Sequence, residues 1–380
     1  MRTAIYCSKK VGLRMRIRSG GHDFEGSSYV SNATFFVMDM FNYRYVKVNN
    51  KERTAWVGAG ATIGETYYAI NKTNSSLAFA AGYWPTIGVG GHVSGGGYGP
   101  LIRKHGLAAD NVIDARIVDA KGRVLTRASM GEDVFWAIRG GTGASFCVIL
   151  AYKVKLVAIT PRVTAFRLYK TLETNATNLV HKWQFVAPKL PRDLLLSLQI
   201  TSINSNQTGR KTIQASFVAV FQGGVPIPVE GLKKIWGQLF KIDNPPGRFE
   251  WTPFGGIMDE IPSTAIPFPY RAGNIFILFE AIEWNGSEPN LQRQRIAWIR
   301  QMQTIIGQYV AKNPRRAYAD YRDLDLGINN PNFTSVEVSR NWAVPYFNQN
   351  YERLVRAKTH IDPFNYFNTE QSIPPYSPRK

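Results

Sequence analysis

Between residues 82 and 99 the chain reads Gly82-Tyr83-Trp84-Pro85-Thr86-Ile87-Gly88-Val89-Gly90-Gly91-His92-Val93-Ser94-Gly95-Gly96-Gly97-Tyr98-Gly99, in which eight of eighteen residues are glycine. Glycine lets backbone amides approach a ligand closely, and it adopts positive φ at little steric cost. Loops that surround phosphates and flavin rings require both properties. The segment therefore predicts a cofactor-binding loop, with a glycine-rich structural loop as the alternative.

The glycine spacing of this segment excludes three familiar sites. It fits neither the G-x-G-x-x-G pattern of dinucleotide-binding folds nor the G-x-x-x-x-G-K-[ST] pattern of nucleotide triphosphatases. Ser94 does not lie in a G-x-S-x-G nucleophile elbow, because His92 takes the place of the first glycine. The ligand is therefore not expected to be held in a Rossmann or P-loop manner.

A second stretch, Arg18-Ser19-Gly20-Gly21-His22-Asp23, combines flexible backbone with an arginine suited to anions and a titratable ring. Alone, His22 is more typical of a hydrogen-bonded surface histidine than of a catalytic one. Together, the two stretches favour one shared ligand site.

The chain has 380 residues and a net charge of +19. Its length suffices for two domains with ordinary cores. The charges are scattered, which argues against nucleic-acid binding, and leaves adsorption to an acidic matrix such as a pectin-rich cell wall open. Alternation in Arg14-Met15-Arg16-Ile17-Arg18 is typical of a strand with one solvated face. No apolar run approaches the ~18 residues of a membrane span.

The first 160 residues alternate short β-branched runs with helix-like pieces, which predicts an α+β domain. A helix is expected from Thr62 to Asn71, since Thr62 followed by Glu65 forms a capping-box pattern. Thr160-Pro161 marks the expected boundary. Strands are predicted at residues 35–40, 54–60, 112–118 and 146–150.

Beyond the boundary the pattern changes to antiparallel strands covered by helices. Strands are predicted at residues 163–168, 194–200, 213–221 and 275–282. Residues 291–310 have the 3.6-residue period of an amphipathic helix, and residues 351–359 predict a last helix.

The two cysteines and the glycosylation signals bear on the compartment. Cys7 and Cys147 lack metal-ligand spacing, so no metal site is predicted, and both are expected to be buried thiols. The start of the chain carries no signal-peptide pattern. Seven Asn-x-Ser/Thr sequons nevertheless favour a chain of the secretory pathway, at Asn32, Asn71, Asn74, Asn175, Asn206, Asn285 and Asn332.

Several further segments, taken with the two glycine stretches, resemble the berberine bridge enzyme-like family of plant FAD-linked oxidoreductases, which includes grass pollen allergens, monolignol oxidoreductases and cannabinoid synthases. The resemblance runs nearly end to end. It rests also on Glu25-Gly26, Gly106 to Asp114, Gly131 to Gly141, Pro267 to Gly273, Tyr321-Arg322-Asp323-Leu324-Asp325 and Glu370 to Pro375.

The resemblance implies an α+β fold of the vanillyl-alcohol-oxidase type. In this fold a two-lobed FAD-binding domain (1–160) is followed by a substrate domain whose antiparallel sheet is covered by helices (161–345), and a C-terminal segment (346–380) returns to the first domain. FAD is the expected cofactor. The family histidine matching His22 is bonded covalently to the flavin, the histidine matching His92 assists its tuning, and the tyrosine matching Tyr321 lies at the active site. The residues expected at the cofactor are Arg18, Ser19, Gly20, Gly21, His22, Asp23, Pro85, Thr86, Ile87, Gly88, Gly90, Gly91, His92, Ser94, Gly95, Gly96, Gly97, Tyr98, Asn111 and Ile113.

The sequence departs from the family at positions that carry chemistry. Trp84 stands where typical members have a cysteine that makes a second bond to the flavin, and Phe24 replaces a tyrosine. Ile277 and Phe279 occupy the strand positions where members with a known base carry Glu or a Lys and Gln pair. Tyr321 is then the expected acid/base group.

Two nearby carboxylates are weaker candidates for the base. By strand alternation Glu280 faces away from Ile277 and Phe279, and a one-residue bulge would reverse this; Glu283 shares their face farther along. Relatives also have a segment before the region of Arg18, and tens of residues between positions that here adjoin at 224/225.

These features predict an oxidoreductase that takes hydride from an alcohol, of the monolignol or carbohydrate type. Ile87 lies where family oxidases have a smaller valine that admits oxygen, so a dehydrogenase using a quinone-like acceptor is expected rather than an oxidase using O₂. The alternative is a catalytically impaired flavin-binding secreted protein of the same family.

Overall fold

The computed structural model describes residues 1–159, 165, 167–220, 229, 230, 233, 247–274, 276–282, 288–312, 315–330 and 335–376. The chain divides into two compact units. Unit 1 comprises Met1–Arg162, Ile261–Tyr270 and Arg316–Lys380, and unit 2 comprises Val163–Glu260 and Arg271–Arg315. Each unit is treated separately below.

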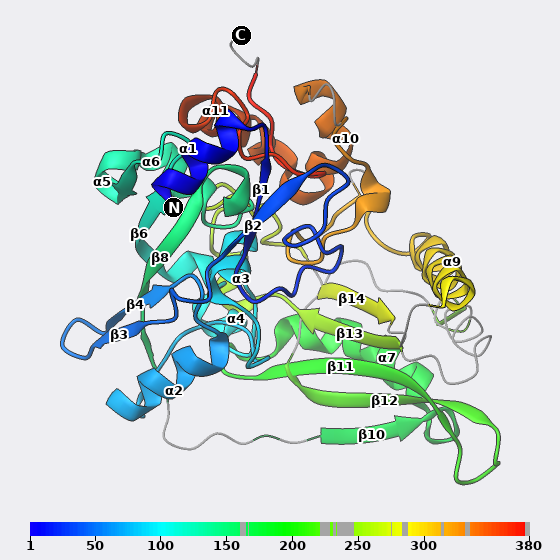
Figure 1. The fold of residues 1–380 in the computed structure, drawn as a ribbon. Coiled ribbons are helices and arrows are strands. Elements are labelled where there is room, and N and C mark those ends of the chain that lie inside the picture. The colour runs from blue at the N-terminus through cyan, green and yellow to red at the C-terminus, as the bar shows by residue number, and fades with distance from the viewer. Residues whose placement is uncertain are drawn as a thin grey trace. The chain divides into compact units, whose positions relative to one another are not determined.

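Unit 1 has an α+β architecture (Figure 1). Its central sheet has five antiparallel strands in the order β3-β4-β8-β6-β7, and two small two-stranded sheets pair β1 with β2 and β5 with β9. The strands are β1 Arg14–Arg18, β2 Phe35–Asp39, β3 Val46–Asn49, β4 Thr54–Gly58, β5 Leu77–Ala78, β6 Val112–Val118, β7 Val124–Thr126, β8 Val148–Lys155 and β9 Val157–Ala158.

The helices of unit 1 lie before, between and after these strands. They are α1 Arg2–Lys10, α2 Ile63–Thr73, α3 Val89–Gly95, α4 Ile102–His105, α5 Arg127–Met130, α6 Glu132–Ala137, α10 Val336–Phe347 and α11 Tyr351–Ile361. Helix α2 begins as predicted: the Thr62 side chain accepts a hydrogen bond from the Glu65 backbone, and the Glu65 carboxylate accepts one from the Thr62 backbone. Such a cap stabilises a helix by about 1 kcal/mol.

The strand at residues 14–18 forms, but its predicted solvated arginine face is wrong at one position. Arg16 is fully buried, and its guanidinium donates to both carboxylate oxygens of Glu370 at 2.7 and 3.0 Å. Burial is tolerable because one guanidinium nitrogen, Nη2, donates to both carboxylate oxygens, and this ion pair offsets the lost hydration of the arginine. The C-terminal segment thus supplies the partner that a local pattern could not reveal.

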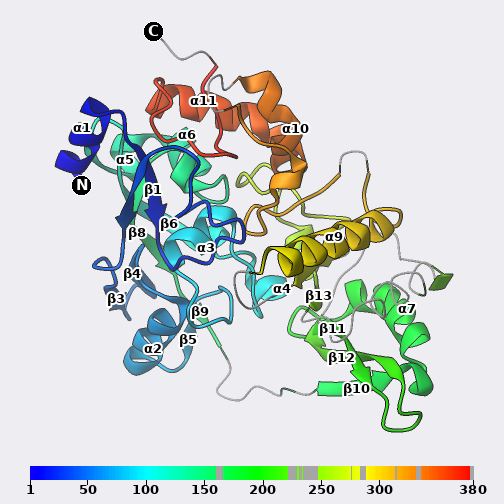
Figure 2. The ribbon, with the colours of Figure 1, turned by 45° about the vertical axis from the view of Figure 1, so that its right-hand side comes forward.

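Unit 2 contains a five-stranded antiparallel sheet in the order β10-β12-β11-β13-β14 (Figure 1; all but β14 are also labelled in Figure 2). Its elements are β10 Arg167–Thr171, α7 Ala176–Val186, β11 Leu195–Asn204, β12 Lys211–Val220, β13 Gly247–Pro253, β14 Phe276–Ile282 and α9 Pro289–Ile306. The sequence analysis did not predict β13, although the apolar Phe249 and Trp251 alternate there with polar residues as in a strand with one buried face.

One face of this sheet packs against α7 and α9. Val180 and Trp183 of α7, Met302 of α9 and Phe249 and Trp251 of β13 belong to one buried cluster. Trp251 also stacks on Phe276 with ring centroids 4.9 Å apart. The predicted antiparallel sheet covered by helices is confirmed.

Strand β14 divides its side chains between the two faces. Phe276 and Leu278 pack against the helix-covered cluster, and Glu280 alternates onto the same side. Ile277 and Phe279 therefore lie on the opposite face. The register with β13 is continuous through all seven residues, so no bulge reverses the direction of Glu280.

Several expectations meet limits or corrections here. Thr160-Pro161, Glu283, the 224/225 junction and most of the predicted 163–168 strand lie outside the described residues. The domain bounds 1–160, 161–345 and 346–380 remain a prediction.

Cys147 is buried as expected, but Cys7 is exposed on α1, and both are free thiols. Among the helices that the structure describes, none is long and apolar enough to cross a membrane.

Candidate functional site

The two glycine-containing stretches of unit 1 meet at Gly20 and Gly88. A Cβ on Gly20 would lie 2.4 Å from the Gly88 nitrogen, and a Cβ on Gly88 would lie 2.3 Å from the Gly20 nitrogen. Ser19 fixes the first stretch by donating its hydroxyl to the Ala59 carbonyl at 2.5 Å. The loop that carries His22 is therefore in direct backbone contact with the 82–99 segment.

Most glycines of the 82–99 segment serve internal packing. A Cβ on Gly95 would lie 1.7 Å from Asp320, one on Gly99 would lie 1.9 Å from the Ala81 carbonyl, and one on Gly90 would lie 2.7 Å from the Ala59 carbonyl. Gly96 and Gly97 have φ of 126° and 73°, which disfavours other residues. Gly91 differs, since it is exposed and a Cβ there would meet nothing within 4 Å. The structural interpretation thus holds for most of these glycines, whereas a ligand contact at Gly91 stays a prediction.

His22 lies on the 18–23 loop and faces solvent. Its ring is exposed and makes no hydrogen bond or ion pair within the described part of the chain. The neighbouring Asp23 is held by Arg322, which donates to Asp23 Oδ2 at 3.0 Å. Arg18 lies 3.6 Å from Asp39 and is about half exposed. The imidazole is therefore accessible on a loop that is anchored on both sides.

His92 lies on α3 in the opposite situation. It is 9% exposed, and its Nε2 accepts the Gly82 backbone N–H at 2.9 Å. Burial lowers the pKa of His92 to about 4. At neutral pH the ring is uncharged, and because Nε2 accepts, its proton is on Nδ1. The ring thus links Gly82, at the start of the 82–99 segment, to helix α3 of the same segment.

A buried acid faces this ring. Asp320 Oδ2 lies 3.9 Å from His92 Nδ1 and accepts the Tyr318 hydroxyl at 2.7 Å. The Tyr318 oxygen in turn accepts the Gly97 N–H at 2.7 Å. Burial raises the pKa of Asp320 to about 7. A carboxyl that gains or loses its proton near neutral pH therefore lies beside the 82–99 segment.

Near this acid, four aromatic rings are in contact, those of Phe24, Tyr98, Tyr318 and Tyr321. Tyr98 and Tyr321 share a hydrogen bond between their hydroxyls. Tyr321 also makes edge contacts with Phe24 and Tyr318, at centroid distances of 5.8 and 5.2 Å. Tyr318 packs against Tyr98 as well. The structure therefore places Tyr321, named from the sequence, beside Tyr98 and next to the loop that carries His22.

The remaining predicted residues divide into exposed and internal positions. Pro85 and Thr86 are exposed and Ile87 is half-buried. Ser94 donates its hydroxyl to the Gly90 carbonyl at 2.6 Å, and Asn111 donates its amide to the His105 and Leu107 carbonyls. These two side chains therefore brace loops.

Ile113 and Trp84 lie on the surface. Ile113 is exposed at the start of β6, where its carbonyl accepts from Arg127 at 3.1 Å. Trp84 is 44% exposed and packs against Tyr83 at a centroid distance of 5.5 Å.

Sequence reasoning missed Tyr318 and Asp320. Their one signal is proximity in sequence, since Tyr318-Ala319-Asp320 directly precedes the Tyr321-Arg322-Asp323 motif. Nothing in the local pattern shows that Asp320 approaches Gly95 closely, because that contact joins segments more than 200 residues apart.

Comparison with known proteins identifies the class of this fold and site. The family described as FAD binding domain matches residues 1–127, and the family described as berberine and berberine like matches residues 317–374. Tetrahydroberberine oxidase from Argemone mexicana is 40% identical over 442 aligned positions, covering 99% of this chain and 81% of the relative. Cannabidiolic acid synthase-like 1 from Cannabis sativa is 41% identical and covers 98% and 81%.

Solved structures give the same answer. A single-residue variant of berberine bridge enzyme, described as a reticuline dehydrogenase, has a TM-score of 0.93 at 35% identity and covers 100% of this chain and 88% of its own. Wild-type Phl p 4.0202, a glucose dehydrogenase, has a TM-score of 0.88 at 35% identity and covers 98% and 88%. The chain belongs to the berberine bridge enzyme-like family of plant FAD-binding oxidoreductases, and its cofactor is FAD.

The alignment with the Argemone relative also bears on the expected internal gap. It extends over 442 positions, more than the 380 residues of this chain, so the relative has residues without a counterpart here. Their location near 224/225 stays a prediction.

The residues of unit 1 fit a flavin. An accessible imidazole without a protein partner, an exposed glycine with open space at its Cα, and exposed Pro85, Thr86 and Trp84 lie along two loops in mutual contact. An aromatic ligand would cover these groups, which in a folded protein without one are exposed to water.

Proposed function

We propose that this protein is an FAD-linked oxidoreductase that carries its flavin on His22 alone and oxidises an alcohol of the monolignol or carbohydrate type. The observation that carries the proposal is the exposed, unpartnered His22 ring on a loop packed backbone to backbone against the glycine segment. Trp84 at the position of the second family linkage supports a single attachment.

When bound, the flavin supplies the electron-accepting chemistry, taking a hydride from the substrate carbon at its N5. The chain's own residues would hold it: His22 would form the tether, and the 18–23 and 82–99 loops would surround it. A covalent tether favours electron acceptance, and it also prevents loss of the cofactor.

Removal of the alcohol proton requires a base, and Tyr321 is the proposed one. As its phenolate, Tyr321 would accept the alcohol proton and become the neutral phenol, and the Tyr98 hydroxyl, which is hydrogen-bonded to it, would stabilise the phenolate by donating to its oxygen. The neighbouring Arg322 guanidinium is held by Asp23 and the Gln371 carbonyl. The role of Tyr321 therefore rests on its position and on the Tyr98 hydroxyl.

A dehydrogenase that passes electrons to a quinone-like acceptor, rather than to O₂, completes the proposal. Secretion and glycosylation are proposed with it, because the sequons at Asn32, Asn71, Asn175 and Asn206 are exposed.

A catalytically impaired flavoprotein is the second candidate. The observation that favours it is the apolar pair Ile277 and Phe279 on the face of the unit 2 sheet that α7 and α9 leave uncovered. Neither side chain can accept a proton.

One experiment tests both. Absorbance near 450 nm that stays with acid-precipitated protein establishes the covalent flavin, and its anaerobic bleaching by coniferyl alcohol or glucose establishes turnover. Protein-bound colour that no alcohol bleaches would favour the impaired form, and absence of bound colour would contradict both candidates.

A further inference from the structure

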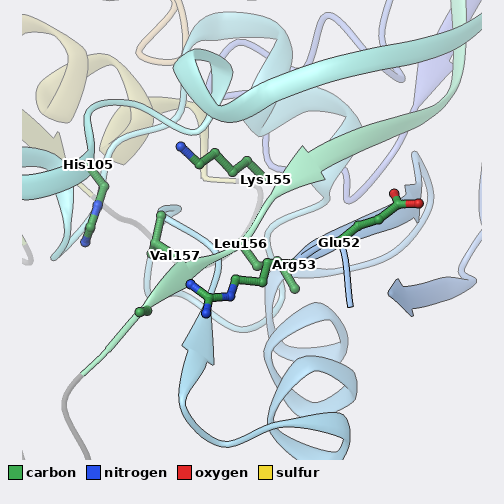
Figure 3. A pocket seen from close by; sticks show the side chains of 7 residues that line it. Glu52, Arg53, His105, Lys155, Leu156 and Val157 are labelled. Atoms are coloured by element: carbon green, nitrogen blue, oxygen red, sulfur yellow. The ribbon is translucent and has the colours of Figure 1, made fainter. Parts of the chain in front are cut away.

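A cavity of about 290 Å³ opens in unit 1 among residues that the flavin proposal does not use. It is lined by Glu52, Arg53, His105, Lys155, Leu156, Val157 and Ala158 (Figure 3). These residues come from the turn between β3 and β4, the end of α4 and the β8–β9 segment. None belongs to the 18–23 or 82–99 loops.

Two of the lining residues are cations without protein partners. Neither the Arg53 guanidinium nor the Lys155 ammonium makes a hydrogen bond or ion pair within the part of the chain that the structure describes. Lys155 pairs in register with Thr54 of β4, and Arg53 directly precedes Thr54, so both cations come from the same end of the β4–β8 pair. Figure 3 shows both extending to the side of the strand on which His105 lies.

The one carboxylate of the cavity is already neutralised. Glu52 accepts a hydrogen bond from Lys153 at 3.0 Å, and that contact lowers the pKa of Glu52. In Figure 3 its carboxylate points away from Arg53 and Lys155. Glu52 therefore does not compensate the positive charges of Arg53 and Lys155 at the cavity.

Backbone geometry holds Arg53 in an unfavourable conformation. Its φ is +51°, in the left-handed region that residues other than Gly, Asn and Asp rarely adopt. The position is fixed because the Arg53 carbonyl accepts the Leu156 N–H at 2.8 Å and its own N–H donates to Asn50. The strained backbone thus carries an arginine where asparagine would fit with less strain, which is consistent with a use for its guanidinium.

The floor of the cavity is apolar, since Leu156 and Val157 are 2% and 6% exposed. Arg53 and Lys155 are themselves exposed, so their attraction for a bound anion is strongest at low ionic strength. The planar fork of arginine donates two parallel hydrogen bonds to an oxyanion, which a lysine alone cannot do.

We propose that this cavity is an oxyanion-binding site, in which Arg53 and Lys155 clasp a phosphate or carboxylate group and the carbon skeleton of the ligand lies on Leu156 and Val157. The two sources of that chemistry are a free phosphate and the uronate residues of an acidic polysaccharide.

The test is calorimetric titration of the full chain at low ionic strength with inorganic phosphate and with trigalacturonate. Arg53→Asn keeps a residue that tolerates positive φ, and Lys155→Gln keeps the stem of the side chain. Each is expected to weaken binding about tenfold, the usual effect of losing one charged hydrogen bond. The control is Lys51→Gln, which removes the same charge from the same turn outside the cavity and should leave binding within about twofold.

The two ligands separate the sources. Tighter binding of trigalacturonate than of phosphate supports a uronate ligand, and the reverse supports a free phosphate. Equal weakening by Lys51→Gln and Arg53→Asn, or no saturable binding of either ligand, overturns the site. Covalent flavin content and melting temperature, measured on the same samples, show that a variant is folded.

Discussion

The two histidines of unit 1 occupy contrasting environments within one ligand-binding region. His22 is exposed, lies on an extended loop and has no hydrogen-bond partner among the residues described, whereas His92 is buried on α3 and holds the Gly82 N–H. A covalent bond to a ligand requires an accessible nitrogen, which the exposed His22 ring provides. A buried ring whose Nε2 is already engaged can instead fix the backbone that surrounds the ligand.

The largest expected effect comes from replacing His22, the exposed member of this pair. In His22→Ala we expect complete loss of the flavin absorbance that survives acid denaturation, because Trp84 offers no second linkage. His92→Ala is the matched control and should retain the covalent bond. Acid-stable flavin in His22→Ala, measured on precipitated protein, would show that the two roles are assigned wrongly.

A second prediction compares two tyrosines that touch each other. Tyr321→Phe keeps the ring contacts with Phe24 and Tyr318 but removes the hydroxyl bound to Tyr98. We expect anaerobic flavin reduction by substrate to slow about 10²-fold, as loss of a general base typically causes, with little change in melting temperature.

Tyr318→Phe should behave in the opposite way. It removes the acceptor for the Gly97 N–H and the donor to Asp320, so its cost is mainly stability, about 1–3 kcal/mol. A Tyr321→Phe enzyme reduced within about threefold of the wild-type rate would leave Tyr321 without the proposed role.

Two glycines of the same segment sharpen the comparison between packing and ligand contact. Gly88→Ala would place Cβ 2.2 Å from Ser19 Oγ and 2.3 Å from the Gly20 nitrogen, and should destabilise the fold by about 2–3 kcal/mol. Gly91→Ala has open space and lies in a helix, where alanine is favoured by up to ~1 kcal/mol. We therefore expect Gly91→Ala to keep or gain stability in chemical denaturation while incorporating less flavin. Equal loss of stability in both variants would contradict the distinction.

These contrasts show what the sequence could predict. The helix cap at Thr62 and Glu65, strand β6 and helix α11 follow from local patterns and were found with little shift. Helix α3 was not predicted, because most of its residues are glycine or histidine, and long-range contacts override that weak helix propensity. Arg16 and Asp320 were misjudged or missed because their partners, Glu370 and Gly95, are distant in sequence.

The pH dependence of stability separates His92 from Asp320. The unfolded histidine binds a proton near pH ~6.5 but the folded ring does so only near pH 4, so His92 removes stability as pH falls through that window. The unfolded aspartate loses its proton near pH ~4 whereas the folded carboxyl keeps it to about 7, so Asp320 removes stability as pH rises through nearly the same window. In the wild type the two effects oppose each other.

Single variants should expose each slope. Asp320→Asn leaves the His92 effect, so the free energy of unfolding should rise from pH 4 to 6.5 by about 3 kcal/mol, at ~1.4 kcal/mol per pKa unit. His92→Gln leaves the Asp320 effect, and the free energy should fall over pH 4 to 7 by a similar amount. Denaturant titrations at several pH values measure both, and parallel slopes in the two variants would contradict the assigned pKa directions.

The smallest expected effect concerns the electron acceptor and Ile87. The Ile87 carbonyl accepts the Ile63 N–H at 2.9 Å and its own N–H donates to the Trp84 carbonyl at 3.3 Å, so the backbone is held on both sides. A β-branched side chain on a fixed backbone has little rotational freedom. In the family this position lies where oxygen reaches the flavin, and isoleucine is one methylene larger than the valine of oxidases.

Ile87→Val should therefore speed reoxidation of the reduced protein in air-saturated buffer, by about tenfold if the barrier falls by ~1.4 kcal/mol, while leaving reduction by substrate nearly unchanged. Stopped-flow absorbance near 450 nm measures both half-reactions. Ile87→Leu is the control, since it keeps the volume and relaxes only the branching. Wild-type protein that already reoxidises as fast as Ile87→Val would mean that Ile87 only packs the loop, and that O₂ is the acceptor.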